Sequence, residues 1–179
     1  MEIFENILLV SGRKRNVGKT TFICNIISLL QNKDITAVKI TPHFHEVTLG
    51  LQSILKGEAW HLYKETNSSQ EKDTSLYLKA GASESYFLQT KKENLVEAFK
   101  ALLLHLPKNN PTIIESAGLI DIIKPGIFVV ILPDGECLKK EIESKLMVSD
   151  LIVISDGKIF YPPPQRIGYD NRWLLKTNK

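Results

Sequence analysis

Short hydrophobic runs rich in β-branched residues recur along the chain, at residues 6–11, 35–40, 84–89, 112–116, 126–132 and 151–155. Longer segments, in which apolar residues have helical spacing, separate several of these runs. This alternation predicts an α/β fold. The continuous run GIFVVIL is typical of a strand covered on both faces, so we expect a mostly parallel sheet in a three-layer α/β/α arrangement.

The clearest helix is predicted over residues 90–106, where Thr90 and Glu93 have the spacing of a capping box. Apolar residues repeat through it at helical intervals: Leu95, Phe99, Leu102, Leu103 and Leu106. We expect these side chains to face the core.

Three more helices are predicted. One begins between Gly18 and Thr21, another begins at Asp73 and ends near Gly81, and the last covers residues 139–149. With 179 residues, 43% of them hydrophobic, the chain suits one domain with a single core over residues 1–179.

Two stretches do not fit the alternating pattern. Residues 42–72 are long for a plain connection, so we expect a loop that receives a substrate or partner, or a small insertion. Residues 158–179 contain a proline triplet that precludes regular helix there. We expect an irregular tail, docked through Trp173 and Leu174.

Composition narrows the class of protein. The 23 basic and 20 acidic residues give a net charge of +3, which is too small and too dispersed to indicate nucleic-acid binding. Cys24 and Cys137 are isolated and lack metal-ligand spacing, which fits the reducing cytoplasm. The apolar run near the N-terminus is too short for a signal core or a membrane span, so we expect no membrane partner.

The stretch SGRKRNVGKTTF, residues 11–22, lies between a predicted strand and a predicted helix, which is the setting of a phosphate-binding loop. Free amides and the positive dipole end at a helix start attract phosphate oxygens. Lys19 would reach the terminal phosphates, and the Thr20 hydroxyl would bind Mg²⁺. A plain turn that packs closely at Gly18 would need neither side chain. The predicted nucleotide-binding residues are Gly12, Arg15, Asn16, Val17, Gly18, Lys19, Thr20 and Thr21.

Three cations, Arg13, Lys14 and Arg15, precede the loop lysine, and the distance from Gly12 to Gly18 is one residue longer than in the standard loop. The cations either form a solvated basic turn or include one that follows charge onto the leaving oxygens during phosphoryl transfer. Lys14 is the best candidate for the second role.

Two charged residues mark strand ends, where ligands bind in open α/β sheets. Lys39 interrupts an apolar strand, which is costly unless an anion accompanies it, although an edge position would leave its ammonium in water. Glu115 follows a short apolar strand, as in a Walker B motif, within reach of the Mg²⁺ shell or of an attacking water.

These motifs resemble known families of P-loop NTPases of the SIMIBI class. The loop GRKRNVGKT and the stretch ESAG at residues 115–118 are similar to those of dethiobiotin synthetases, and KDT with AGA, within residues 72–82, looks like the molybdopterin-guanine dinucleotide biosynthesis family MobB. KRNVGKT also resembles the deviant Walker A loop KGGxGKT, in which a signature lysine stands where Lys14 does. The resemblance covers roughly residues 5–135. It implies that Lys39 faces the reacting phosphate or carbamate and that Asp73 holds Mg²⁺ directly or through water.

Other candidate residues keep more than one interpretation. Asp73 alone is explained by a helix N-cap. His43, His45 and Glu46 could bind a transition metal, contact a substrate or form a surface loop without a role. Asp156 could contact a base, but the Asn-Lys-x-Asp motif of GTPases is missing, which favours ATP over GTP.

The sequence predicts a P-loop NTPase that binds Mg²⁺ and ATP or GTP. The predicted catalytic residues are Lys14, Lys19, Lys39 and Glu115, and the predicted metal ligands are Thr20, Asp73 and Glu115. Three functions stay open: a MobB-like accessory of molybdopterin cofactor biosynthesis, a ligase resembling dethiobiotin synthetase, and a slow nucleotide-dependent switch that regulates a partner protein. The second substrate, a small molecule or a protein, and homodimer formation also stay open.

Overall fold

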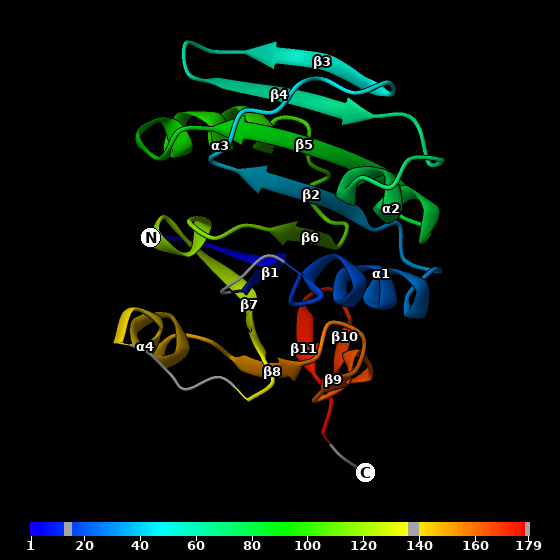
Figure 1. The fold of residues 1–179 in the computed structure, drawn as a ribbon, viewed down its shortest axis with the longest axis vertical. Helices are drawn as coiled ribbons and strands as arrows, with labels where there is room; N and C mark the ends of the chain where they lie inside the picture. The colour runs from blue at the N-terminus through cyan, green and yellow to red at the C-terminus, as the bar shows by residue number, and fades with distance from the viewer. Residues whose placement is uncertain (13–15, 136–139, 178–179) are drawn as a thin grey trace.

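The computed structural model describes residues 1–12, 16–135 and 140–177. Over these residues a nine-stranded sheet forms the middle layer, with strand order β3-β4-β5-β2-β6-β1-β7-β8-β9 (Figure 1). Six strands run parallel: β1 Glu2–Gly12, β2 Thr36–Thr41, β5 Glu84–Thr90, β6 Thr112–Glu115, β7 Ile123–Pro133 and β8 Leu151–Ser155. All six correspond to hydrophobic runs in the sequence.

Helices cover both faces of the sheet, which confirms the predicted three-layer α/β/α class. The helices are α1 Lys19–Leu29, α2 Asp73–Lys79, α3 Leu95–Leu103 and α4 Lys140–Met147. Phe22 of α1 and Tyr77 of α2 belong to the hydrophobic core on one face, and Phe99 of α3 belongs to the core on the other face. The central strands of the sheet are therefore buried on both faces, as their apolar residues require.

The predicted start of the helix over residues 90–106 is wrong. Thr90 is the last residue of β5, where it pairs with Trp60, and its hydroxyl donates to the carbonyl of Lys91. A short 3-10 helix, η1 Lys92–Asn94, precedes α3. The capping box does not form because the strand ladder holds Thr90 in extended conformation.

Residues 42–72 contain an antiparallel hairpin, β3 Leu51–Lys56 and β4 Trp60–Glu65, that extends the sheet beyond β5. In β4, Trp60 and Leu62 enter the core on the α3 side, while Tyr63 lies on the opposite face. The segment is thus part of the sheet for much of its length, and only residues 42–50 and 66–72 connect it to β2 and α2.

The tail, residues 158–179, is more regular than predicted. It begins with β9 Phe160–Tyr161, antiparallel to β8, and a 3-10 turn, η3 Pro164–Arg166. A hairpin of β10 Ile167–Tyr169 and β11 Trp173–Leu175 follows. Trp173 docks it: the side chain is buried in the α1-side core, and its indole N–H donates to the carbonyl of Asn6 at 2.8 Å.

The structure describes one of the two cysteines and most of the chain in which a membrane-spanning helix could occur. Cys24 is a free thiol that is partly buried, and Cys137 lies outside the described residues. Among the helices of the described chain, none has both the length and the apolar character needed to span a bilayer.

Candidate active site

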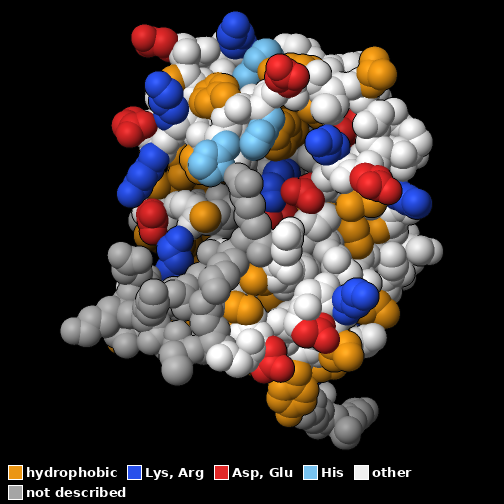
Figure 2. All heavy atoms as spheres, viewed as in Figure 1, with side chains coloured by type: hydrophobic (Ala, Val, Ile, Leu, Met, Phe, Trp, Pro, Cys, Tyr) orange, Lys and Arg blue, Asp and Glu red, His pale blue; other side chains and the backbone are white. Residues whose placement is uncertain are grey.

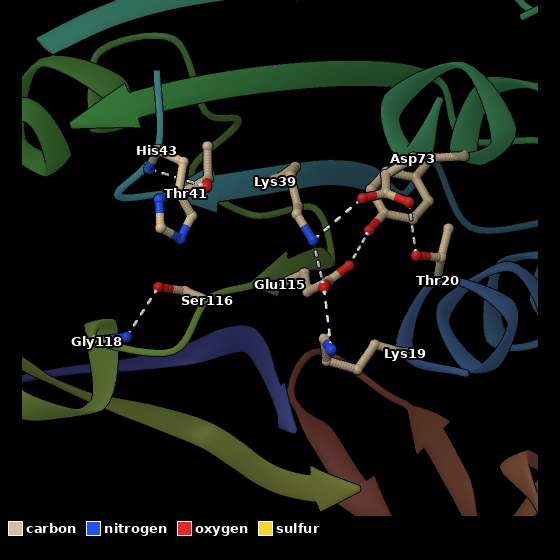
Figure 3. Close-up of polar contacts among 10 residues, drawn as sticks. Lys19, Thr20, Lys39, Thr41, His43, Asp73, Glu115, Ser116 and Gly118 are labelled. Carbon is tan, nitrogen blue, oxygen red and sulfur yellow. Dashed lines mark hydrogen bonds and ion pairs between the residues drawn. The ribbon is translucent and has the colours of Figure 1, made fainter. Parts of the chain in front are cut away.

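The carboxyl ends of three central strands bring the predicted site residues together. β1 leads into α1, β2 ends beside it, and β6 lies between β1 and β2. Lys19, Lys39 and Glu115 therefore converge, and α2 adds Asp73 from above the same edge (Figure 3). This is the position where open α/β sheets bind ligands.

The backbone at the start of α1 has the features of a phosphate-binding turn. Asn16 and Gly18 have left-handed φ angles of 64° and 84°, and no described side chain caps the helix. A Cβ atom at Gly18 would lie 2.8 Å from the carbonyl oxygen of Gly157, and one at Gly12 would lie 2.9 Å from the Lys19 side chain. The glycines thus allow close packing around a helix start, where backbone amides and the positive end of the helix dipole suit an anion.

A hydroxyl and a carboxylate lie next to this turn. The Thr20 hydroxyl donates to Asp73 Oδ1 at 2.7 Å. Both groups offer the hard oxygen ligands that Mg²⁺ prefers, so these two residues would hold such an ion. Asp73 is the first residue of α2, after Lys72 at the N-cap position, and it makes no capping hydrogen bond. The N-cap interpretation is therefore wrong.

Lys39 lies between two carboxylates. Its ammonium is 3.1 Å from Asp73 Oδ2 and donates a hydrogen bond to Glu115 Oε1. β2 is a central strand, which excludes the edge position that would leave this lysine in water. Lys39 therefore connects the two acidic residues of the site.

Glu115 is buried, with 3% of its side chain exposed, and each of its oxygens is engaged. Besides Lys39, Oε1 faces the Lys19 ammonium at 3.9 Å. Oε2 accepts a 2.7 Å hydrogen bond from the Tyr77 hydroxyl. Tyr77 was not predicted from the sequence, although it follows Asp73 by one helical turn and so shares its face of α2.

The charges shift the pKa values of these groups. Burial lowers the pKa of Lys39, but the charges of Glu115 and Asp73 outweigh it and raise the pKa above its ordinary value. Burial lowers the pKa of Lys19, with Glu115 opposing and Lys39 adding to the effect. Burial and then the Glu115 charge raise the pKa of Tyr77 well above its usual range. Lys39 and Tyr77 therefore stay protonated near neutral pH.

Lys19, Lys39, Asp73 and Glu115 line a cleft of about 710 Å³, which is within the range of small-molecule and cofactor sites. Figure 2 shows Lys or Arg and Asp or Glu side chains next to each other in the middle of this face, beside pale blue histidines. Predicted residues that line the cleft are Gly12, Asn16, Gly18, Lys19, Thr20, Thr21, Lys39, Asp73 and Glu115.

Some of the predicted site residues do not line the cleft or lie outside the described residues. The Val17 side chain is 4% exposed and packs in the α1-side core. Arg13, Lys14 and Arg15 lie outside the described residues.

The loop that carries His43, His45 and Glu46 borders the cleft but shows no metal-binding geometry. His43 and His45 line the cleft, with ring centroids 6.3 Å apart, and Glu46 lines a smaller neighbouring pocket. The described parts of the chain contain no group of three or more His, Cys, Asp or Glu residues suited to a metal ion. The transition-metal interpretation thus has no structural support.

Asp156 has a structural role in the turn after β8. Its Oδ1 accepts hydrogen bonds from the amides of Lys158 and Ile159, each at 2.8 Å. These bonds lower the pKa of this carboxyl. The next residue, Gly157, packs against the turn at Asn16 and Gly18 and lines the cleft, whereas Asp156 does not line it.

The comparison with solved structures supports the fold. A scan against protein-family models finds no match, and a search of curated proteins finds no significant match. Among solved structures, the chain is similar to LpxK from Aquifex aeolicus, solved in complex with ATP, with a TM-score of 0.51 and 16% sequence identity. The match covers 86% of this chain and 49% of that chain, so the present chain spans about half the length of LpxK. The chain has the P-loop NTPase fold.

Proposed function

We propose that the cleft binds a nucleoside triphosphate with Mg²⁺ and cleaves or transfers its γ-phosphoryl group. The observation that carries this proposal is the convergence of Lys19, Lys39, Asp73 and Glu115 at the start of α1. Two ammonium groups and a helix start suit a polyphosphate, whose charge they would neutralise.

Each residue has a distinct task in this proposal. Lys19 binds the terminal phosphates, while Thr20 and Asp73 hold Mg²⁺, which would neutralise charge on the phosphate oxygens. Glu115 holds the ammonium of Lys39 in position, and Tyr77 fixes Glu115. Lys39 then stabilises the charge that develops on the transferred group. Lys14 stays a candidate for a further cation.

ATP is the favoured nucleotide. Asp156, the one candidate for a guanine contact in the sequence, uses its carboxylate to close its own turn. LpxK, which shares the fold, was solved with ATP.

Transfer to a small acceptor is the specific activity that we favour, as in the dethiobiotin synthetase resemblance. A second pocket adjoins the cleft and shares Lys39, Thr41, His45 and Asp73 with it. A MobB-like accessory role is the second candidate, supported by the KDT stretch that places Asp73 beside Thr20. An acceptor stimulates ATP turnover in the first case, whereas an accessory or a switch hydrolyses slowly alone and responds to a partner protein.

The first test is calorimetric titration with ATP and GTP, with and without Mg²⁺. Lys19→Ala should weaken ATP binding by about a hundredfold or more, because it removes a charge-assisted contact to the phosphates. Lys79→Ala removes an exposed lysine from the end of α2 and should leave the affinity unchanged. Equal affinities in the two variants would contradict the proposal.

A further inference from the structure

Five residues from five neighbouring strands form one row across the sheet, on the face that carries α1 and α2. The strand register pairs Ser53 with Tyr63, Tyr63 with Phe87, Phe87 with Lys39, and Lys39 with Glu115. Directly paired residues point to the same face of a sheet. An aromatic surface therefore leads from the β3–β4 hairpin to the ammonium of Lys39.

A small pocket of about 220 Å³ lies on this surface. Phe87 and Leu51 give it apolar walls, and Lys39 and Asp73 line both this pocket and the nucleotide cleft. At about 30 Å³ for each water molecule, it has the volume of roughly seven waters, which suits a molecule with a single ring or a short chain. A molecule there and a phosphate in the cleft would share the Lys39 ammonium.

Several side chains of the pocket can donate to an anion, while two acids, Glu46 and Asp73, also line it. The Lys39 ammonium has three N–H donors, and Asp73 and Glu115 use two of them. The Thr41 oxygen accepts from the amide of His43, which leaves its own O–H to donate. Lys72 adds another cation at the wall. Donors above apolar walls match an oxyanion attached to an apolar body.

The two carboxylates beside Lys39 are not placed to act as a base on an acceptor. Glu115 accepts from Lys39 and Tyr77, and Asp73 accepts from Thr20 and pairs with Lys39. An acceptor that is already ionised needs no base. A carboxylate meets this requirement at neutral pH, whereas an alcohol does not.

From these contacts we infer that the small pocket binds a carboxylic acid with a compact apolar or aromatic body and presents its carboxylate to the γ-phosphate of ATP. The inference rests on the proposed function. A carboxylate oxygen attacks the γ-phosphorus, and the bond from that phosphorus to the β–γ bridging oxygen breaks. The bond's electron pair leaves with ADP, and the product is an acyl phosphate. No proton is gained or lost.

Binding is tested with small probes and a matched pair of variants. Benzoate, phenylacetate and hexanoate are titrated into the full chain beside benzamide and benzyl alcohol, and binding is followed by ligand-observed NMR. At least one acid should bind roughly tenfold more tightly than both neutral probes, because only an anion gains the charge-assisted bonds. Equal binding of acid and amide, or no binding of any acid, would overturn the inference.

The position of the probe is tested by filling the pocket. Leu51→Trp places a bulky indole ring in the wall of the pocket and should abolish acid binding. Leu49→Trp, at a residue 82% exposed and outside the pocket, should retain acid binding. Thermal unfolding of both variants shows whether they are folded. Acid binding that survives in folded Leu51→Trp would place the site elsewhere.

Transfer is tested separately with Mg²⁺, ATP and hydroxylamine, which converts an acyl phosphate to a hydroxamate. A hydroxamate should form with at least one acid; its absence with every acid, or phosphorylation of benzyl alcohol instead, refutes the transfer step. Calorimetry with ATP alone distinguishes the two proposals. Failure to bind ATP refutes the proposed function, whereas ATP binding without acid binding refutes only the assignment of the pocket.

Discussion

Tyr77 shows how one side chain organises the charged cluster. Tyr77 is fully buried, and its hydroxyl donates to Oε2 of Glu115 while Lys39 donates to Oε1. A buried carboxylate needs all of these partners, since an unpaired charge is costly away from water. The Glu115 carboxylate, which Tyr77 holds, positions the Lys39 ammonium, although Tyr77 itself does not line the cleft.

Tyr77→Phe should lower the free energy of unfolding by about 1.5–3 kcal/mol, because the buried carboxylate loses a hydrogen bond to a charged acceptor. It should also reduce ATP turnover more than ATP affinity, since Lys39 becomes less well positioned. Chemical denaturation and steady-state kinetics measure the two effects.

The control is Tyr169→Phe, which removes a 3.0 Å hydrogen bond to the exposed carbonyl of Asn109. We expect it to cost less than about 1 kcal/mol and to leave turnover unchanged. If both variants lose the same stability and activity, Tyr77 has no special role in the site.

At the scale of elements, apolar content decided which strands could be predicted. The six parallel strands read as hydrophobic runs. Those in the middle of the sheet are buried on both faces, whereas Ile152 and Ile154 leave one face of β8 exposed. β3 could not be found this way, because its residues are exposed or half-buried and its stability comes from pairing with β4. Thr90 and Glu93 matched a capping box, but pairing of Thr90 with Trp60 outweighed this local preference.

The β10–β11 hairpin is another element held by tertiary contacts. Trp173→Ala should destabilise the protein by about 3–5 kcal/mol, because it opens a cavity in the α1-side core and removes the bond to Asn6. Thermal unfolding and limited proteolysis of the tail measure the loss. Tyr161→Ala, at a residue 77% exposed, should cost much less. A large loss there as well would indicate general fragility of the tail.

At the scale of the whole molecule, the cleft joins segments that are distant in sequence. α1, β2, α2, β6 and the turn after β8 all contribute to it. A ligand that binds only when these segments are assembled stabilises the folded state by mass action.

Mg²⁺ and ATP at about a hundred times the dissociation constant should therefore add about 2.7 kcal/mol to the free energy of unfolding. Scanning calorimetry at rising ATP concentrations checks the expected increase in Tm. AMP, which lacks the terminal phosphates, should give a much smaller shift. An AMP shift equal to that of ATP would mean that the phosphates do not carry the binding.

The sequence alone determined the layered α/β class, the strand-turn-helix of the P-loop and the charged residues at the strand ends, because hydrophobic patterning and backbone preferences depend on residues close together along the chain. Only the tertiary structure decided that Lys39 lies between Asp73 and Glu115, that Tyr77 fixes Glu115 and that the β3–β4 hairpin forms beside Phe87. These contacts depend on strand order and register, which bring together side chains that no local pattern relates.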